Sequence, residues 1–449
     1  MAQVTSLGSS SADSSPGGEL YPLMCGQRWL LLLLERSPQS ARPVQRIYRL
    51  CKPLDTASFL AAFRHVVSSH PALRTRLVRT ADGWRQCFPE FEAEISGITV
   101  RGRTREARAV YAQHLFANDS AQPFDLCSVP PFLARVIEVD GEHYFSLCLD
   151  HIAADDLAMD LLERNISEAY LRERQGQSHP PTPATQSFYD YLDRETAQKA
   201  KEPSNLRYWI DQLSGHPLGR NQTEEIIWVP GEAHQWQVSG DALDRLRRLC
   251  RSNQVSLFAL VLAAYVRLLS ELAGTDDLVV NVPVSNRTRA VDHDLIANLS
   301  MLLHMRFRLT GTAEDRRFLL SVRDQVLNAM AHRHYDYDKL SEIMSGDAAK
   351  RGGRIHWAAG CSYIIERQTQ PAASTLFEER LDNLPGARFD IPHGGFALTC
   401  RQNVSRLQFS ADWDFSTWPS HGEQLERRFL EILDSLAPSA SLFPTLTAV

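Results

Sequence analysis

The amino-acid sequence predicts an α+β protein built from two lobes of similar make-up. At 449 residues the chain is too long for one ordinary hydrophobic core, so two domains are expected. Segments with helical and strand periodicity follow one another without strict alternation, which favours the α+β class over a doubly wound sheet. A stretch with one glycine and three prolines at residues 175–187 separates two halves that each contain both kinds of segment.

The composition is that of a soluble globular protein, with 43% hydrophobic and 23% charged residues. A formal charge of -6 argues against nucleic acid as the main partner, because phosphate binding needs a basic face. The apolar run at residues 29–34 is far shorter than the roughly 18 residues typical of a membrane span. The Ser/Gly-rich residues 1–18 lack the basic start and apolar core of a signal peptide, so a disordered leader and a cytoplasmic location are expected.

Eight cysteines are spread along the chain, and none form a Cys-x-x-Cys pair. This spacing argues against a zinc knuckle or a redox motif, and no metal site is expected. Most of the cysteines lie in apolar surroundings, which predicts small core residues in a reducing compartment.

The first half contains helices and strands in mixed order. The helix predicted at residues 55–69 carries one apolar stripe, and the helix at residues 23–35 has Gln27 on its polar side. Another helix is predicted at 105–117, and strands are predicted at 44–51, 73–78, 84–88 and 132–139.

The most informative stretch is YFSLCLDHIAADD at residues 144–156. Its first six residues predict a buried strand, and apolar residues at helical spacing begin after it, with Asp155 or Asp156 as the helix cap. The tight turn between them carries Asp150, His151 and Asp155 at the mouth of a sheet, where a base is held rigidly and reached by substrate. The alternative is that the aspartates only cap the helix and that His151 is an ordinary loop residue.

The second half repeats this mixture after a polar helical connector at residues 188–213. Helices are predicted at 241–253, 257–272, 315–332 and 421–436, and strands at 226–229, 233–238, 278–283, 357–365, 395–402 and 405–413. The expected organisation is a leader (1–18), an N-terminal lobe with the turn (19–175), a linker and connector helix (176–215), a C-terminal lobe (216–440) and a tail (441–449).

Several segments together resemble the condensation domains of nonribosomal peptide synthetases, which are relatives of chloramphenicol acetyltransferase. That family carries His-His-x-x-x-Asp-Gly on a strand-to-helix turn, where this chain has DHIAADD at residues 150–156. The resemblance covers about residues 20–440 and suggests a free-standing domain. Its other segments, in the family's order, are SHPALRT (69–75), PFDL (123–126) with PPFLAR (130–135), YW to LSG (208–215), TDDLVVNVPVSNR (275–287) and residues 298–306.

The resemblance implies two chloramphenicol-acetyltransferase-like lobes in a V-shaped pseudo-dimer with a tunnel along their seam. An acyl or peptidyl carrier protein would present an acyl thioester on its phosphopantetheine arm from one side. A small acceptor molecule or a second carrier would enter from the other side. The family implies no cofactor of the domain's own, and a monomer is expected.

The resemblance also implies roles for the turn residues. His151 matches the family's second histidine and would act as general base or as a positioning acceptor, since a neutral imidazole suits proton transfer near pH 7. Asp155 would be structural, paired with Arg74 in a bidentate carboxylate–guanidinium contact. Asp150 replaces the family's first histidine, and Asp156 replaces its glycine, so a charged side chain would narrow or re-polarise the tunnel.

Five further residues are tunnel candidates. Ser285, Asn286 and Arg287 end the segment that resembles the family's loop in the second lobe. His393 lies on a Gly-rich turn and Tyr363 on a predicted strand, and for both an ordinary structural role is the alternative.

Three functions remain open. The first is a condensing acyltransferase that forms an amide or ester. The second is a catalytically degenerate domain that recruits partner enzymes to a carrier, a role in which the family motif also ends in a double aspartate; the retained His151 favours the first. The third is heterocyclisation, because Asp150 and Asp155 have the required spacing, although Ala158 stands where that branch has serine. Neither a Gly-x-Ser-x-Gly nor a phosphate-binding glycine loop occurs, so hydrolase and kinase functions lack support.

Overall fold

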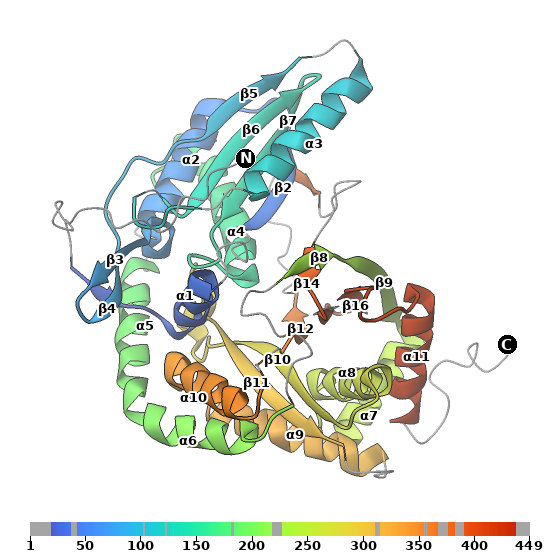
Figure 1. Ribbon diagram of the computed structural model, residues 1–449. Helices are drawn as coiled ribbons and strands as arrows, with labels where there is room; N and C mark the ends of the chain where they lie inside the picture. The colour runs from blue at the N-terminus through green and yellow to red at the C-terminus, as the bar shows by residue number, and fades with distance from the viewer. Residues whose placement is uncertain are drawn as a thin grey trace.

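The computed structural model describes residues 19–36, 43–101, 104–121, 124–128, 130–180, 184–217, 227–309, 315–353, 355, 357–366, 376–381 and 390–436. The predicted leader (1–18) and tail (441–449) lie outside the described residues. Within these ranges the chain forms two lobes, each with a mixed sheet and helices (Figure 1). The predicted α+β class is therefore confirmed.

The N-terminal lobe is a five-stranded sheet in the order β13-β2-β7-β6-β5, in which only β5 and β6 are parallel. The helices α2 (Thr56–Ser69) and α4 (Asp156–Arg174) bury their apolar stripes together on one face, and α3 (Arg105–Ala121) covers the other. The strands are β2 (Val44–Leu50), β5 (Ser96–Val100), β6 (Phe132–Val139), β7 (Glu142–Leu149) and β13 (Phe377–Arg380).

A small three-stranded sheet flanks this lobe next to the helix α1 (Cys25–Arg36). Its strands are β1 (Tyr21–Pro22), β3 (Arg76–Thr80) and β4 (Gly83–Cys87). The strand predicted to start at residue 73 begins three residues later, because Pro71–Arg74 forms a single 3-10 turn (η2). Pro71 has its φ pre-set for the first turn of such a helix.

The C-terminal lobe is a six-stranded sheet in the order β11-β10-β12-β15-β16-β9, in which β12 runs parallel to both of its neighbours. The helix α8 (Leu257–Ala273) is apolar nearly all round and is buried in the core, as its sequence predicts. The other helices of this lobe are α7 (Gly240–Asn253), α9 (Asp315–Ala331), α10 (Tyr337–Lys350) and α11 (Gly422–Ser435). The strands are β9 (Glu232–Ser239), β10 (Asp277–Ser285), β11 (Ser300–Arg308), β12 (Ala359–Ile365), β15 (Phe396–Gln402) and β16 (Arg406–Trp413), with β8 (Trp228–Pro230) and β14 (Asp390–Pro392) forming a separate pair.

The connector is two helices, α5 (Ala184–Gln198) and α6 (Glu202–Leu213), joined by a 3-10 turn (η3, Lys199–Lys201) along one side of both lobes (Figure 1). Its end is fastened to the C-terminal sheet by Arg306. The guanidinium contacts both carboxylate oxygens of Asp277 at 2.7 and 2.5 Å and donates to the carbonyls of Ser214 and Gly215 at 2.6 and 2.7 Å. Three of the segments that carry the family resemblance therefore meet at this one buried arginine.

The strand β13 crosses from the C-terminal half of the chain into the N-terminal sheet, where it pairs antiparallel with β2. Just before it, the carbonyl of Leu376 accepts from the Cys51 amide at 2.8 Å, and the Leu376 side chain is fully buried in the N-terminal core. The sequence did not predict this strand, because FEER has a single apolar residue and no alternation. β5, β11, α10 and β14 were also not predicted.

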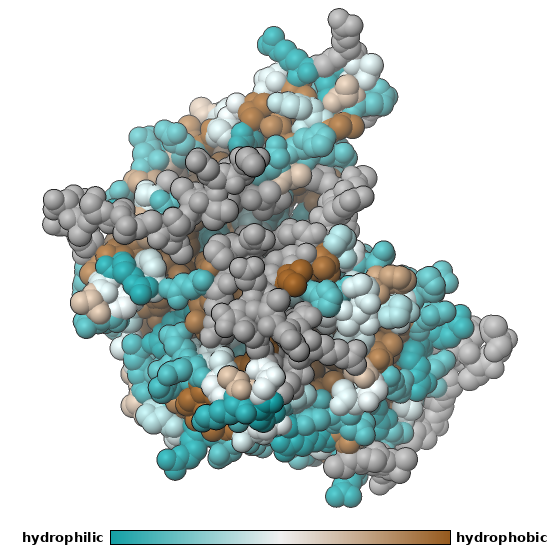
Figure 2. Space-filling view, viewed as in Figure 1, coloured by the Kyte–Doolittle hydropathy of each residue, from teal (hydrophilic) through white to brown (hydrophobic). Residues whose placement is uncertain are grey.

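The outline of the molecule is notched on one side, between the two lobes (Figure 2). Within the described ranges, no single helix is both long and apolar enough to cross a membrane. Only α7 and α8 taken together meet the criterion of length and composition, and they are bent by 101° at their junction.

We expect Leu376→Ala to destabilise the N-terminal lobe although the residue comes from the C-terminal half. The substitution removes a fully buried side chain and should lower the free energy of unfolding by about 2–5 kcal/mol. Urea unfolding followed by tryptophan fluorescence measures this change. The control Leu327→Ala removes a leucine that is 61% exposed on α9 and should change stability by no more than about 0.5 kcal/mol. If both substitutions changed the free energy of unfolding by equally small amounts, the packing of Leu376 and β13 in the N-terminal lobe would be contradicted.

Candidate active-site turn

The turn between β7 and α4 is fixed by its own backbone and by its neighbours. The amide of Asp150 donates to the Pro131 carbonyl at 2.8 Å, and the Ala153 amide donates to the Asp150 carbonyl at 3.0 Å. Ile152, Ala153 and Ala154 are completely buried. A segment this short and this buried has little freedom, so the side chains on it have defined directions.

Asp150, at the position of the family's first histidine, stabilises the turn itself. Its Oδ1 accepts a hydrogen bond from the Ile152 amide at 2.8 Å, an arrangement typical of aspartate in turns. The side chain is buried, and this burial raises the pKa of the Asp150 carboxyl group above its ordinary value. Asp150 therefore stands where the family has a histidine, and in this protein it holds the backbone of the turn.

His151 is half-buried, and its hydrogen bonds define the tautomer of its ring. Nδ1 lies 2.7 Å from the Ala154 carbonyl oxygen. A carbonyl oxygen only accepts, so Nδ1 carries the ring proton and Nε2 of the neutral ring has a free lone pair. Within the described part of the chain, Nε2 makes no hydrogen bond. From the other lobe, Asn298 Nδ2 donates to the His151 carbonyl at 2.8 Å.

Asp155 forms a buried bidentate ion pair with Arg287 and not with Arg74, so the predicted pairing is wrong. Arg287 Nη1 lies 2.5 Å from Oδ2 and Nη2 lies 3.0 Å from Oδ1, with the two side chains 1% and 9% exposed. The carboxylate also accepts from the Ala158 amide at 2.9 Å, which caps α4, and from the Leu299 amide at 3.0 Å. One carboxylate thus joins the turn, the helix start and the opposite lobe.

Arg74 is the last residue of the 3-10 turn η2, where it is buried and has other partners. Its Nη1 donates to the Phe88 carbonyl at 3.0 Å and to Glu90 Oε1 at 2.5 Å. These contacts hold the end of β4 and leave the guanidinium engaged away from the active-site turn. Arg74 supports the small flanking sheet rather than the motif.

The remaining tunnel candidates divide into buried and exposed residues. Arg287 is buried, and besides pairing with Asp155 it donates to the Leu295 and Ala297 carbonyls at 3.1 Å each. Asn286 is likewise buried and contacts the Tyr191 hydroxyl at 2.8 Å. Ser285 is exposed.

Tyr363 and His393 lie in the hydrogen-bond network of the C-terminal lobe. The Tyr363 hydroxyl donates to Gln402 Oε1 at 2.5 Å, and its ring packs 5.7 Å from that of Phe258. His393 is 36% exposed, with Nε2 at 3.9 Å from Asp414 Oδ2.

Asp156, at the position of the family's glycine, is partly exposed and faces two arginines. Its carboxylate lies 3.6 Å from Arg401 Nη2 on β15 of the other lobe and 3.8 Å from Arg46 Nη2. Arg46 also donates to the Asp156 carbonyl at 3.0 Å and pairs with Asp160 at 2.6 Å. The extra charge is therefore compensated, and part of the compensation crosses the seam between the lobes.

Two residues of α1 were missed or misplaced by sequence reasoning, and one of them holds the turn. Gln27, predicted on the polar side of its helix, is completely buried and donates to Gln86 Oε1 at 2.9 Å and to the Ile152 carbonyl at 3.2 Å. The only signal in the sequence that could have indicated this role is a single glutamine next to a run of leucines. Gly26 packs against β11 so closely that a Cβ there would lie 2.2 Å from the Ser300 carbonyl oxygen.

Comparison with known proteins agrees with this fold. The condensation-domain family model matches residues 18–352, and the chain belongs to that family. Cyclosporin synthetase simA of Tolypocladium inflatum is 28% identical over 376 residues, which is 76% of this chain and 2% of that protein. Bacitracin synthase 3 of Bacillus licheniformis is 25% identical over 392 residues, which is 85% of this chain and 6% of that protein. The chain thus spans less than a tenth of the length of these relatives.

Solved structures of condensation domains have the same fold. The first condensation domain of the CDA synthetase matches with a TM-score of 0.69 and 17% identity, covering 94% of this chain and 98% of that one. The X-domain from teicoplanin biosynthesis, in its complex with OxyB, matches with a TM-score of 0.72 and 22% identity, covering 97% of both chains. The two chloramphenicol-acetyltransferase-like lobes expected from the sequence are therefore present.

A double-mutant cycle distinguishes the two candidate partners of Asp155. Asp155→Asn keeps an oxygen for the Ala158 amide but leaves the Arg287 charge buried without a counterion, which should cost about 3–5 kcal/mol of unfolding free energy. Combined with Arg287→Met, it should show a coupling energy of about 0.5–3 kcal/mol in urea unfolding. Combined with Arg74→Met, the two effects should add to within about 0.5 kcal/mol. Coupling with Arg74→Met and additivity with Arg287→Met would instead support the pairing of Asp155 with Arg74 that was predicted from the sequence.

Proposed function

We propose that this protein is a condensing acyltransferase that joins a carrier-bound acyl thioester to an amine or alcohol acceptor in nonribosomal peptide or polyketide biosynthesis. The observation that supports this most strongly is the His151 ring, whose Nδ1–H is held by the Ala154 carbonyl so that Nε2 is available as a proton acceptor. Membership of the condensation-domain family supports the same reaction class. The donor and the acceptor would meet at His151 in a tunnel along the seam of the two lobes.

In the proposed reaction the acceptor nitrogen or oxygen attacks the thioester carbonyl. A C–N or C–O bond forms, the C–S bond breaks, and the phosphopantetheine sulfur of the partner carrier leaves. His151 Nε2 takes the proton from the acceptor, or orients the acceptor by accepting its hydrogen bond, and that proton ends on the departing thiolate. The protein's contribution is to hold the reactants within about 3–3.5 Å in an aligned geometry.

The structure disfavours heterocyclisation through Asp150 and Asp155. Both oxygens of Asp155 are engaged by Arg287 and by backbone amides, and Asp150 is buried on the Ile152 amide. A carboxylate that acts as a base needs a free oxygen in reach of substrate. Neither carboxylate meets that requirement as well as His151 Nε2.

Recruitment of a partner enzyme to a carrier remains the second candidate function. The feature in its favour is the double aspartate at Asp155 and Asp156, with Asp150 at the position of the family's first histidine. One solved relative of this fold is an X-domain in complex with OxyB. For this chain the two functions differ in whether turnover occurs once a carrier is bound.

The first test follows an acyl-loaded carrier protein by intact mass with amines, alcohols and a second loaded carrier as acceptors. Wild type should show acceptor-dependent loss of the acyl mass. His151→Ala should reduce the rate by about 10²–10⁴-fold, the usual contribution of a positioned acid–base group. His151→Gln keeps a hydrogen-bonding side chain without the basic nitrogen, so partial activity in this variant would indicate positioning rather than proton transfer.

The matched control is His114→Ala, which removes an exposed histidine on α3 and should retain the wild-type rate. Equal turnover by wild type and His151→Ala would exclude His151 as the working residue. If a carrier binds both proteins and neither shows turnover with any acceptor, the recruitment function replaces the condensing one.

Position 156 should control which acyl chains are accepted. Because the Asp156 charge is balanced by Arg46 and Arg401, we expect its size rather than its charge to restrict the donor path. Asp156→Gly should therefore raise kcat/KM for longer acyl chains, while Asp156→Asn should leave the acyl profile unchanged. Stability should change by no more than about 1 kcal/mol in either variant, since the Asp156 side chain is 41% exposed and the buried Arg46 keeps its pair with Asp160. If wild type and both variants showed the same preference among acyl chains, Asp156 would not lie on the donor path.

A further inference from the structure

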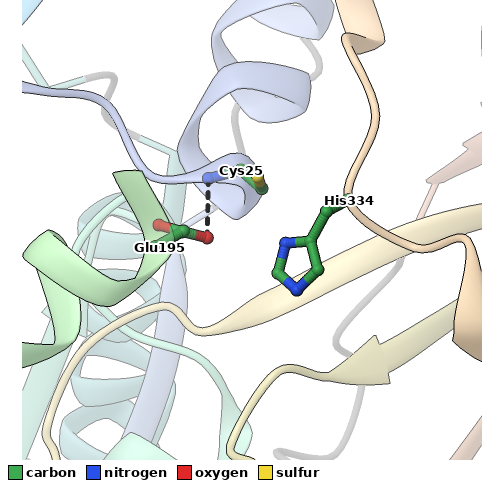
Figure 3. Close-up of side chains that lie close together, drawn as sticks. All are labelled: Cys25, Glu195 and His334. Atoms are coloured by element: carbon green, nitrogen blue, oxygen red, sulfur yellow. Dashed lines mark hydrogen bonds between the residues drawn. The ribbon is translucent and has the colours of Figure 1, made fainter. Parts of the chain in front are cut away.

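Three side chains of different chemistry meet away from the active-site turn, at the junction of three segments. Cys25 is the first residue of α1, Glu195 lies on α5, and His334 lies between α9 and α10. Their sulfur, carboxylate oxygen and ring nitrogen all lie within 4.8 Å of one another. Figure 3 shows the His334 ring facing the space beside Cys25 and Glu195.

Two backbone contacts position the cluster, and the Cys25 thiol and the Glu195 carboxylate are hydrogen-bonded to each other, a contact that a metal ion would replace. The Cys25 amide donates to Glu195 Oε1 at 3.2 Å, which ties the start of α1 to α5. The His334 carbonyl accepts from Asn205 Nδ2 at 2.6 Å, which ties its segment to α6. The cluster is therefore positioned by the same contacts that join the connector helices to both lobes.

His334 supplies an independent sign that the cluster is incomplete. The residue is 7% exposed, and its buried Nδ1 has no hydrogen-bond partner in the described part of the chain. Burial, together with the nearby Arg333 and Lys201, lowers the pKa of His334 to about 4, so the ring is neutral at pH 7. A neutral imidazole nitrogen buried without a partner is costly to keep and is a ready ligand for a metal ion.

We propose that Cys25, Glu195 and His334 bind a divalent transition-metal ion of the zinc class, with water as the fourth ligand. Sulfur, imidazole nitrogen and carboxylate oxygen are the zinc ligands of proteins, and three of them leave one position open. Ligand atoms around such an ion are about 3.3–3.8 Å apart, so atoms that now lie within 4.8 Å of one another need to close by about 1.5 Å at most.

The surroundings of the cluster leave space beside the ligands and suit the charge of such an ion. Two small hollows meet at Cys25 and Arg28: Leu192 and Lys199 also line the first, and Trp29 and Tyr335 also line the second. A thiolate and a carboxylate together neutralise the ion's two charges. The neighbouring cations, Arg28 among them, therefore face a site with no net charge.

Binding requires a proton to leave the cysteine. The metal–sulfur bond forms as the S–H bond breaks, and the proton passes to solvent.

The bound ion would connect the N-terminal lobe, the connector and the C-terminal lobe at one point. The sequence offered no sign of it, since the three residues are far apart along the chain and have no Cys-x-x-Cys or His-x-His spacing. This proposal concerns a separate site from the active-site turn and does not depend on the condensing activity.

The test is titration of the metal-free full-length protein with Co²⁺, a spectroscopic substitute for Zn²⁺. We expect one equivalent to bind, with a sulfur-to-cobalt charge-transfer band in the near ultraviolet and visible bands of a tetrahedral centre. Zn²⁺ should then displace the cobalt and abolish the bands. Thermal unfolding of the same samples should occur at a higher temperature with Zn²⁺ than without it, because only the folded chain holds the three ligands together.

Variants assign the ligands. Cys25→Ser should lose the charge-transfer band, and His334→Gln should weaken Co²⁺ binding at least tenfold, while both keep the metal-free melting temperature to within a few degrees. The control Cys127→Ser removes another half-buried cysteine and should leave the spectrum unchanged. Absence of the band in wild type, or its survival in Cys25→Ser, would overturn the proposal.

Discussion

The buried pair of Asp155 and Arg287 is the constraint on which the rest of the active-site region depends. Asp155 comes from the turn that carries His151, and Arg287 comes from the loop after β10 in the other lobe. Every oxygen of the carboxylate is used, by the guanidinium, by the start of α4 and by the Leu299 amide. Because a buried charge is expensive without its partner, the two lobes cannot separate at this point without a large cost. The pair therefore fixes both the shape of the turn and its distance from the opposite lobe.

The strongly periodic segments and the turn could be predicted from the sequence, and the long-range partners could not. α2, β6, β7 and α8 were predicted nearly to the residue, because their apolar spacing is strict and their caps are ordinary ones. The partner of Asp155 was not, because several arginines occur in segments that resemble the family, and nothing local distinguishes Arg74 from Arg287. The choice is made by tertiary packing: η2 turns Arg74 toward Phe88 and Glu90, while the loop after β10 buries Arg287.

The dependence on tertiary packing also explains the other differences between the sequence-based predictions and the structure. β13 is short and polar, and it forms only because the edge of β2 is free to pair with it. Glutamine is a residue type usually found at the surface, yet the side-chain amide of Gln27 donates to the Ile152 carbonyl of the buried turn. The Cys25, Glu195 and His334 cluster consists of residues with no shared spacing in sequence. Each of these features is decided by which segments the fold brings together, and a single sequence does not contain that information in local form.

The two departures from the family motif have different physical consequences. At position 150 a carboxylate replaces an imidazole, and it is accommodated within the turn by one backbone amide, so the direction of His151 is preserved. At position 156 a side chain replaces a glycine, and it is accommodated by Arg46 within the lobe and by Arg401 across the seam. The first change leaves the His151 ring oriented by its own contacts, while the second adds bulk and a cross-lobe contact beside it. Under the proposed condensing function, the altered motif would therefore keep the chemistry and change which substrates reach it. The crossing strand β13 acts in the same direction. Together with the Asp155–Arg287 pair it ties the two lobes at two points, so a bulky substrate of that reaction would be accommodated by side-chain movement more readily than by opening of the lobes.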